Sequence, residues 1–114
     1  MKQPAPDVTE ADVKRVLLRD FEPNDVAQIE AQLRECDPAL SPRAILAALK
    51  LSDCVFESVS GNLAQARLDW RDVIAYAEYP SYMQKVPGAG ALTDEQLEDV
   101  YRADWAQYQA WLGR

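Results

Sequence analysis

A series of seven apolar side chains in the middle of the chain constrains the fold more than any other feature. Spacings of three and four residues alternate along it and place the seven side chains on one helix face: Phe56, Val59, Leu63, Ala66, Trp70, Val73 and Ala77. Gly61 interrupts the stretch, but a helical glycine costs only about 1 kcal/mol relative to alanine. Burial of each large apolar side chain returns roughly 1.5–3 kcal/mol. The series therefore predicts one long helix over residues 54–79, which ends before Pro80.

Capping residues and further apolar stripes predict four more helices, over residues 9–20, 23–36, 42–52 and 94–112. Thr9 and Thr93 each precede, by three residues, a side chain that can complete a capping box. Pro23 and Pro42 stand at first-turn positions, where the missing N–H of proline costs nothing. Because no stretch of useful length alternates apolar and polar residues as a strand does, we expect an all-α fold.

Two segments are predicted to lie outside these helices. Residues 1–8 form an N-terminal tail that Pro4 and Pro6 stiffen. Residues 80–92 contain two prolines and two glycines and predict a loop, with a short turn around Tyr82 and Met83. Residues 9–114 are then a single-domain bundle of about five helices, with the long fourth helix at its centre and its first helices arranged up and down.

The charge balance and the absence of histidine exclude several classes of function. The chain has 12 Lys and Arg residues against 19 Asp and Glu residues, a formal net charge of −7. Nucleic acids and anionic membrane surfaces are bound by clustered cations, so we expect neither as a partner. A chain without histidine has no Ser-His-Asp or Cys-His catalysis and no imidazole zinc site. We see no phosphate-binding loop and expect no cofactor.

The two cysteines, Cys36 and Cys54, each fall on or near the apolar face of a predicted helix. We expect both to be buried, reduced thiols; a redox pair is the alternative, although their spacing matches no redox motif. The start of the chain lacks the apolar region of a signal peptide. The longest apolar run, residues 44–49, is much shorter than the roughly 18 residues of a membrane helix. These features predict a cytoplasmic location.

Two acidic pairs on separate predicted helices form the candidate metal site. Asp69 and Asp72 share one face of the fourth helix, and Glu95 and Glu98 share one face of the fifth. Facing each other, four carboxylates could hold Mg²⁺ or Mn²⁺, which prefer oxygen ligands. All-helical nucleotide pyrophosphohydrolases use acidic pairs in this general way. The similarity is one of spacing alone, and the second pair also suits the N-terminus of a helix.

Aromatic and charged residues in the C-terminal half form a candidate interaction surface. Arg71 and Tyr76 lie on the fourth predicted helix, and Tyr79 and Tyr82 lie at and just after its end. Trp111 is off the inward stripe of the last helix, and exposed tryptophans are enriched at interfaces. The alternative is structural: a solvated helix face that pairs with neighbouring arginines, and a tryptophan that covers the end of the bundle.

Two segments carry motifs that resemble a known group. Residues 47–51 are Ala-Ala-Leu-Lys-Leu, and residues 69–80 begin with Asp-Trp-Arg-Asp-Val and end with Glu-Tyr-Pro. In both segments the chain resembles a group of small uncharacterised bacterial all-helical proteins, which has a glycine where Cys54 stands here. The resemblance covers about residues 9–80. It implies a helical fold and a bacterial cytoplasmic origin, and it supplies no established activity and no catalytic residue.

Three functions remain open at this point. The first is a non-enzymatic protein-interaction or regulatory module that binds a protein partner or a second copy of itself. The second is a divalent-metal-dependent hydrolase that uses Asp69, Asp72, Glu95 and Glu98. The third is a small-molecule-binding domain with an aromatic pocket between the fourth and fifth predicted helices. The missing catalytic motifs favour the first.

Overall fold

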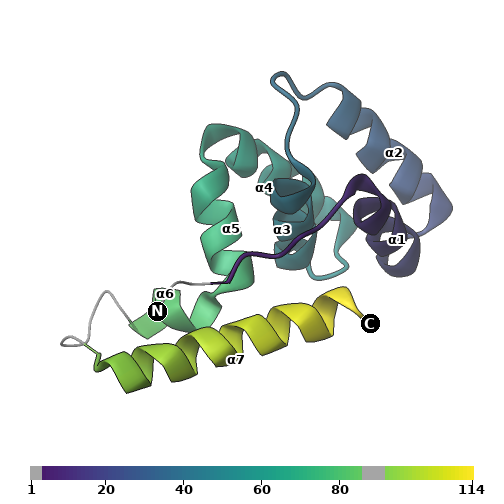
Figure 1. Cartoon of the computed structure of the whole chain (residues 1–114). Helices are drawn as coiled ribbons and strands as arrows, with labels where there is room; N and C mark the ends of the chain where they lie inside the picture. The colour runs from purple at the N-terminus through teal and green to yellow at the C-terminus, as the bar shows by residue number, and fades with distance from the viewer. Residues whose placement is uncertain (1–3, 86–91) are drawn as a thin grey trace.

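The computed structural model describes residues 4–85 and 92–114 and, within them, consists of helices without strands (Figure 1). The helices are α1 (Glu10–Asp20), α2 (Pro23–Arg34), α3 (Pro42–Ser52), α4 (Phe56–Leu68), α5 (Trp70–Glu78), α6 (Pro80–Lys85) and α7 (Asp94–Leu112). The all-α prediction is confirmed. The expected count of about five is wrong, because the described residues form seven helices.

The predicted helix starts are confirmed where short-range capping determines them. The Asp12 carboxylate of α1 accepts the backbone N–H of Thr9 at 2.9 Å. The Ser41 hydroxyl accepts a backbone N–H of α3 at 3.2 Å. At α7, the Thr93 hydroxyl accepts the N–H of Gln96 at 3.1 Å, and the Gln96 side chain accepts the N–H of Thr93 at 2.9 Å. Each cap satisfies amides that have no partner inside the helix.

The single long helix over residues 54–79 is wrong. The chain breaks at Asp69, whose backbone is extended (φ −152°, ψ 93°), so that α4 ends at Leu68 and α5 begins at Trp70. The Asp69 carboxylate accepts the backbone N–H of Arg71 at 3.1 Å and caps α5. Aspartate bonds more favourably to free amides at a helix start than within a helix, which explains the position of the break. The helix continues through Gly61, as predicted.

Part of the predicted loop over residues 80–92 is helical. Pro80–Lys85 forms α6, and residues 86–91 lie outside the described part of the chain. The first amides of α6 have a distant acceptor, because the carboxylate of Asp104 on α7 accepts the N–H groups of Ser81 and Tyr82, each at 3.0 Å. This contact provides what the local sequence lacks for a helix start.

Helix α3 is the centre of the main hydrophobic core. It packs against α1, α4 and α5, and its small side chains let these neighbours approach closely. Its buried apolar residues are Ala44, Leu46, Ala47, Ala48 and Leu49. Five residues of the predicted series also face this core, although they come from two helices: Val59, Leu63, Ala66, Val73 and Ala77. Most of the predicted seam is therefore buried without forming one rod.

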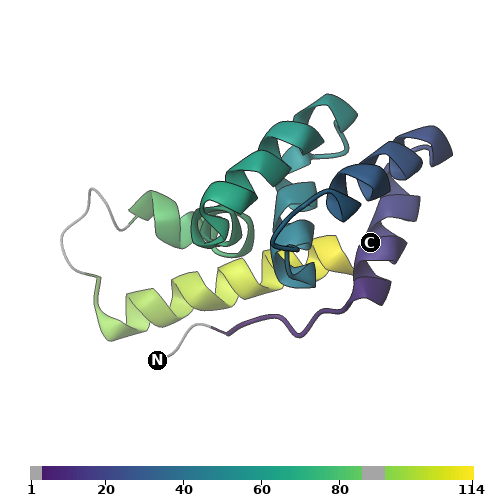
Figure 2. The ribbon, with the colours of Figure 1, turned by 90° about the horizontal axis from the view of Figure 1, so that it is seen from above.

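Helix α7 lies beneath the other helices and ends near α1 (Figures 1 and 2). Two arginines of α1 hold its end: Arg15 donates to the carbonyl of Leu112 and Arg19 to that of Trp111, both at 2.8 Å. The structure measures 47 × 28 × 22 Å, and its radius of gyration of 14.9 Å exceeds the roughly 13 Å typical of a chain this long. None of the described helices is long and apolar enough to span a bilayer.

The cysteines differ from their prediction in one respect. Cys36 is half-buried at the end of α2, whereas Cys54 is exposed, so the predicted burial of both thiols is wrong. Cys54 follows α3 in a left-handed conformation (φ 63°), next to Asp53 (φ 49°). Glycine is the residue that adopts this conformation without steric cost, so the cysteine at this position is strained.

Candidate functional site

The corner between α4 and α5 exposes two large apolar side chains. Leu68 is 82% exposed and Trp70 is 52% exposed. In a continuous helix Trp70 would lie in line with the buried residues of the seam. The extended residue Asp69 between the two helices changes the direction of the chain, so that Trp70 lies outside the core. Exposed apolar side chains that lie next to each other, as these two do, are characteristic of interaction surfaces, and tryptophan is enriched there.

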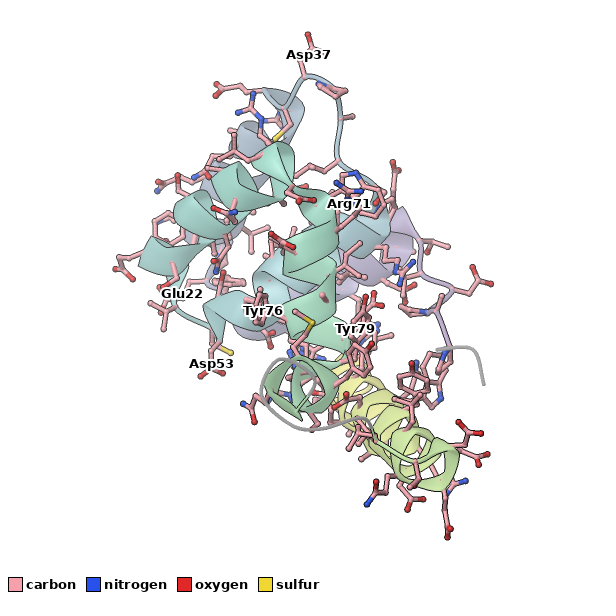
Figure 3. All side chains as sticks on the ribbon, turned by 90° about the vertical axis from the view of Figure 1, so that its left-hand side faces the viewer. Glu22, Asp37, Asp53, Arg71, Tyr76 and Tyr79 are labelled. Atoms are coloured by element: carbon pink, nitrogen blue, oxygen red, sulfur yellow. The ribbon has the colours of Figure 1, made fainter. Side chains whose placement is uncertain are left out.

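This corner forms one wall of a groove of about 940 Å³. The opposite wall is the segment between α2 and α3, residues 37–41, and Figure 3 shows Asp37 of this segment and Arg71 of α5 on the same side of the molecule. Most of the lining is apolar, including Pro38, Leu40, Ala44, Ala64, Leu68, Trp70 and Ile74. The volume lies within the range of ligand-binding clefts, and the lining suits an apolar anchor.

The described lining of the groove holds two arginines, Arg43 and Arg67, and one acidic residue, Asp37, although the chain as a whole is acidic. Arg67 lines the groove and makes no ion pair with any described residue. Arg71 lies beside the groove, where its exposed guanidinium contacts Asp69 at 3.3 Å. An acidic ligand would therefore meet Arg67 directly, and Arg71 in competition with Asp69.

Arg43 on the groove wall is held by a buried partner. Its guanidinium donates two hydrogen bonds to the carboxylate of Glu78, at 2.7 and 2.6 Å. Glu78 is 5% exposed, at the end of α5. This bonding to Glu78 raises the pKa of Arg43 above its usual value, despite partial burial. The pair fixes α3 against α5 and thereby fixes the groove wall.

The two acidic pairs do not form a metal site in this structure. Asp69 and Asp72 lie at the start of α5, and Glu95 and Glu98 lie at the start of α7. Within residues 4–85 and 92–114, no group of three or more Asp, Glu, Cys or His side chains is placed to hold a metal ion. Asp69 instead caps a helix, and Glu98 forms an ion pair with Arg102 at 3.8 Å.

The predicted aromatic interaction residues occupy different places. Tyr76 is exposed and Tyr79 half-buried, on different sides of α5 (Figure 3). Tyr79, Tyr82 and Tyr101 form a cluster, with ring centroids 5.9 Å apart in the first pair and 5.6 Å in the second. Trp111 is half-buried, and the Arg19 guanidinium lies 5.3 Å from its ring centroid. Trp111 thus covers the end of the bundle, the structural alternative weighed above.

Helices α5, α6 and α7 meet around buried polar groups. Asp104 is buried and bonds the start of α6, and the Gln107 amide donates to the carbonyl of Glu78 at 3.1 Å. Tyr108 is also buried, and its hydroxyl has no hydrogen-bond partner within residues 4–85 and 92–114. The cavity at this junction measures about 10 Å³, the size of one water molecule. It has no room for the small molecule that the sequence left open for a pocket here.

The groove was not predicted from the sequence. Arg71 lies beside it, but Leu68 and Trp70 were not identified, because the apolar spacing assigned Trp70 to the core. A signal for the corner existed: Asp69 followed three residues later by Asp72 is the arrangement of a helix cap and an acidic first turn. We interpreted the same two residues as an acidic pair for a metal.

Comparison with known proteins adds no further information about the site. No protein-family model, no curated protein and no solved structure matches this chain.

Proposed function

We propose that this chain is a protein-interaction module whose groove between the α4–α5 corner and residues 37–41 binds an acidic, partly apolar segment of a partner protein. The observation that carries the proposal is the exposure of Leu68 and Trp70 beside a groove of about 940 Å³. Tryptophan and arginine dominate the binding energy of measured interfaces. Both residue types are present at the groove, in Trp70 and Arg67.

Charge determines the kind of partner that we propose. The chain carries a net charge of −7, so acidic partners are repelled from most of its surface. Arg67, which makes no ion pair with any described residue, creates a local exception beside the apolar wall, and Arg71 adds to it where a ligand displaces Asp69. A segment with one large apolar side chain and neighbouring carboxylates fits both features, and its binding should weaken as salt is added.

The second of the functions suggested by the sequence receives less support. A metal-dependent hydrolase needs its carboxylates gathered, and the four candidates are divided between two helix starts.

We propose a cytoplasmic, bacterial setting for the module. The unpaired thiols of Cys36 and Cys54 support a reducing compartment.

The proposal is tested by capture from an extract of the native host, with the full chain as bait. The groove variant is Leu68→Ser/Trp70→Ser. The matched control is Leu18→Ser/Tyr76→Ser, which removes side chains that are 60% and 54% exposed outside the groove. We expect the wild type and the control to retain the same partner, and the groove variant to lose at least tenfold of it, about 1.4 kcal/mol.

Two results would contradict the proposal. One is equal capture by the groove variant, with circular dichroism showing that the variant is folded. The other is an equal loss of the partner by the control Leu18→Ser/Tyr76→Ser, because exposed apolar side chains outside the groove would then matter as much as those beside it. Light scattering measures the molar mass of the same proteins and of Trp111→Ala, and so separates a partner protein from self-association. A wild type that is a monomer, with a mass that Trp111→Ala leaves unchanged, excludes a second copy bound through that residue.

A further inference from the structure

The N-terminal segment lies in a second aromatic site, at the junction of α5 and α7. Figure 2 shows this segment running beside α7 before it enters α1. Pro6 is buried although it belongs to no helix. Pro4 and Pro6 line the same water-sized cavity as four aromatic residues, Tyr79, Tyr101, Trp105 and Tyr108. We call these four residues the aromatic cradle.

The chemistry of the aromatic cradle complements proline. Proline fixes its own backbone near the polyproline II conformation, and that conformation leaves carbonyl oxygens without internal hydrogen bonds. The aromatic cradle offers flat apolar faces together with three tyrosine hydroxyls and one indole N–H, which are donors. Burial raises the pKa of Tyr79, Tyr101 and Tyr108, which keeps these hydroxyls protonated.

The charged groups of the cavity are already paired. The carboxylate of Glu78 is bonded to Arg43, and that of Asp104 is bonded to the amides of α6. What remains is the Tyr108 hydroxyl, which is buried and has no hydrogen-bond partner in the described part of the chain. A buried hydroxyl of this kind carries an unfavourable free energy that an incoming carbonyl would remove. The site therefore favours a neutral peptide backbone over an ion.

The N-terminal segment is held in a way that permits exchange. Among the described residues, no hydrogen bond joins residues 4–7 to α5 or α7, and the first bond of the segment is that of Thr9 to Asp12 within α1. Pro4–Asp7 can therefore leave the aromatic cradle without breaking a hydrogen bond. Because the cavity that remains holds about one water molecule, another ligand can enter only when this segment leaves.

We propose that the aromatic cradle is a binding site for an extended Pro-x-Pro segment of a partner protein, and that Pro4-Ala5-Pro6 occupies it as an internal competitor. A tethered segment has an effective concentration in the millimolar range. When the dissociation constant of the tethered segment itself is about 100 µM, the segment weakens any ligand that competes for the site by about tenfold. The site is separate from the α4–α5 groove, so the proposal stands independently of the function proposed above.

The test uses the full chain and a synthetic peptide with the sequence of residues 2–9 as the probe. Binding is measured by calorimetry to the wild type and to Pro4→Ser/Pro6→Ser. We expect the variant to bind the peptide about tenfold more tightly than the wild type, and a peptide with both prolines replaced by alanine to bind neither. The matched control Ala5→Ser, which changes an exposed residue between the prolines, should behave as the wild type.

A second variant connects the affinity to the aromatic cradle. Adding Trp105→Ala to Pro4→Ser/Pro6→Ser removes one aromatic face of the cradle and should weaken the peptide about fivefold, a loss of roughly 1 kcal/mol of apolar contact. The proposal is overturned when the folded proline variant binds no more tightly than the wild type, or when the proline-free peptide binds equally well. If the proline variant does not fold, the wild type is titrated with the peptide, and the indole resonance of Trp105 is followed by NMR. The proposal requires this resonance to move saturably, and a resonance that stays in place overturns it.

Discussion

The ion pair between Arg43 and Glu78 provides the most direct test of how α3 is held against α5. Its two hydrogen bonds, at 2.7 and 2.6 Å, form the parallel arrangement that is strongest between guanidinium and carboxylate. The two residues differ in exposure: Glu78 is 5% exposed, whereas the Arg43 side chain is 34% exposed. Removing the arginine therefore leaves a carboxylate that water reaches poorly.

We predict that Arg43→Met lowers the free energy of unfolding by about 3 kcal/mol. Breaking one side of a buried pair costs about 3–5 kcal/mol, and the lower end applies because the partly exposed arginine lets some water reach the gap. The double variant Arg43→Met/Glu78→Gln removes the charge together with its partner. It should recover about 2 kcal/mol of that loss, since replacing both members of a buried pair is often close to neutral.

Urea unfolding of the wild type, both single variants and the double variant measures this coupling. At about 1–3 kcal/mol per molar urea, a loss of 3 kcal/mol moves the midpoint by at least about 1 M. A loss below about 1 kcal/mol for Arg43→Met would refute the reasoning, because the pair would then behave as an exposed one. Equal losses for Arg43→Met with and without Glu78→Gln would refute it as well.

Three further variants test other features of the structure. Cys54→Gly should raise the free energy of unfolding by about 0.5–1 kcal/mol in urea, because glycine lacks the Cβ that opposes a left-handed backbone, whereas Cys54→Ala should give no gain. Tyr108→Phe should not destabilise the chain at pH 7, since no described residue bonds to the lost hydroxyl. The raised pKa of Tyr108 means that the unfolded chain ionises first as pH rises above about 10, so Tyr108→Phe should also reduce the loss of stability in alkaline urea titrations. Asp104→Ala should abolish the hydrogen-exchange protection of the Ser81 and Tyr82 amides and leave the centre of α3 protected.

The helix starts could be predicted because the interactions that determine them span three residues. The Ser41 hydroxyl and the Thr93–Gln96 box are local in sequence and form as expected. The burial of α3 was also predictable, because apolar residues occupy most faces of this helix. These features depend on neighbouring residues alone, so a single sequence contains them.

The break at Asp69 was missed because two local signals conflict there. The apolar spacing is continuous from α4 into α5, and most residues on both sides are buried, as the spacing requires. Spacing reports which side chains face the core, but it does not report whether the backbone between them stays helical. Asp69 settles this through one short-range bond to the N–H of Arg71. A cap signal outweighed seven apolar positions in register.

Helix α6 and the buried proline could not be predicted from local pattern. The acceptor for the first amides of α6 is Asp104, more than 20 residues further along the chain. Pro6 is buried beside residues of α5 and α7 that lie about 70 residues or more further along the chain. Both depend on where α7 packs. The arginines of α1 that hold the end of α7 bond to backbone carbonyls, and every residue has a backbone carbonyl, so the sequence does not single out these partners.

The two proposed sites meet at one ion pair, and this determines which variants can distinguish them. Arg43 lines the α4–α5 groove, and its partner Glu78 lines the cavity of the aromatic cradle. A variant of either residue would alter both sites and support neither proposal. Leu68→Ser/Trp70→Ser and Pro4→Ser/Pro6→Ser leave the pair intact. Loss of protein capture by the first and gain of peptide affinity by the second are therefore separate results, and each can fail without the other.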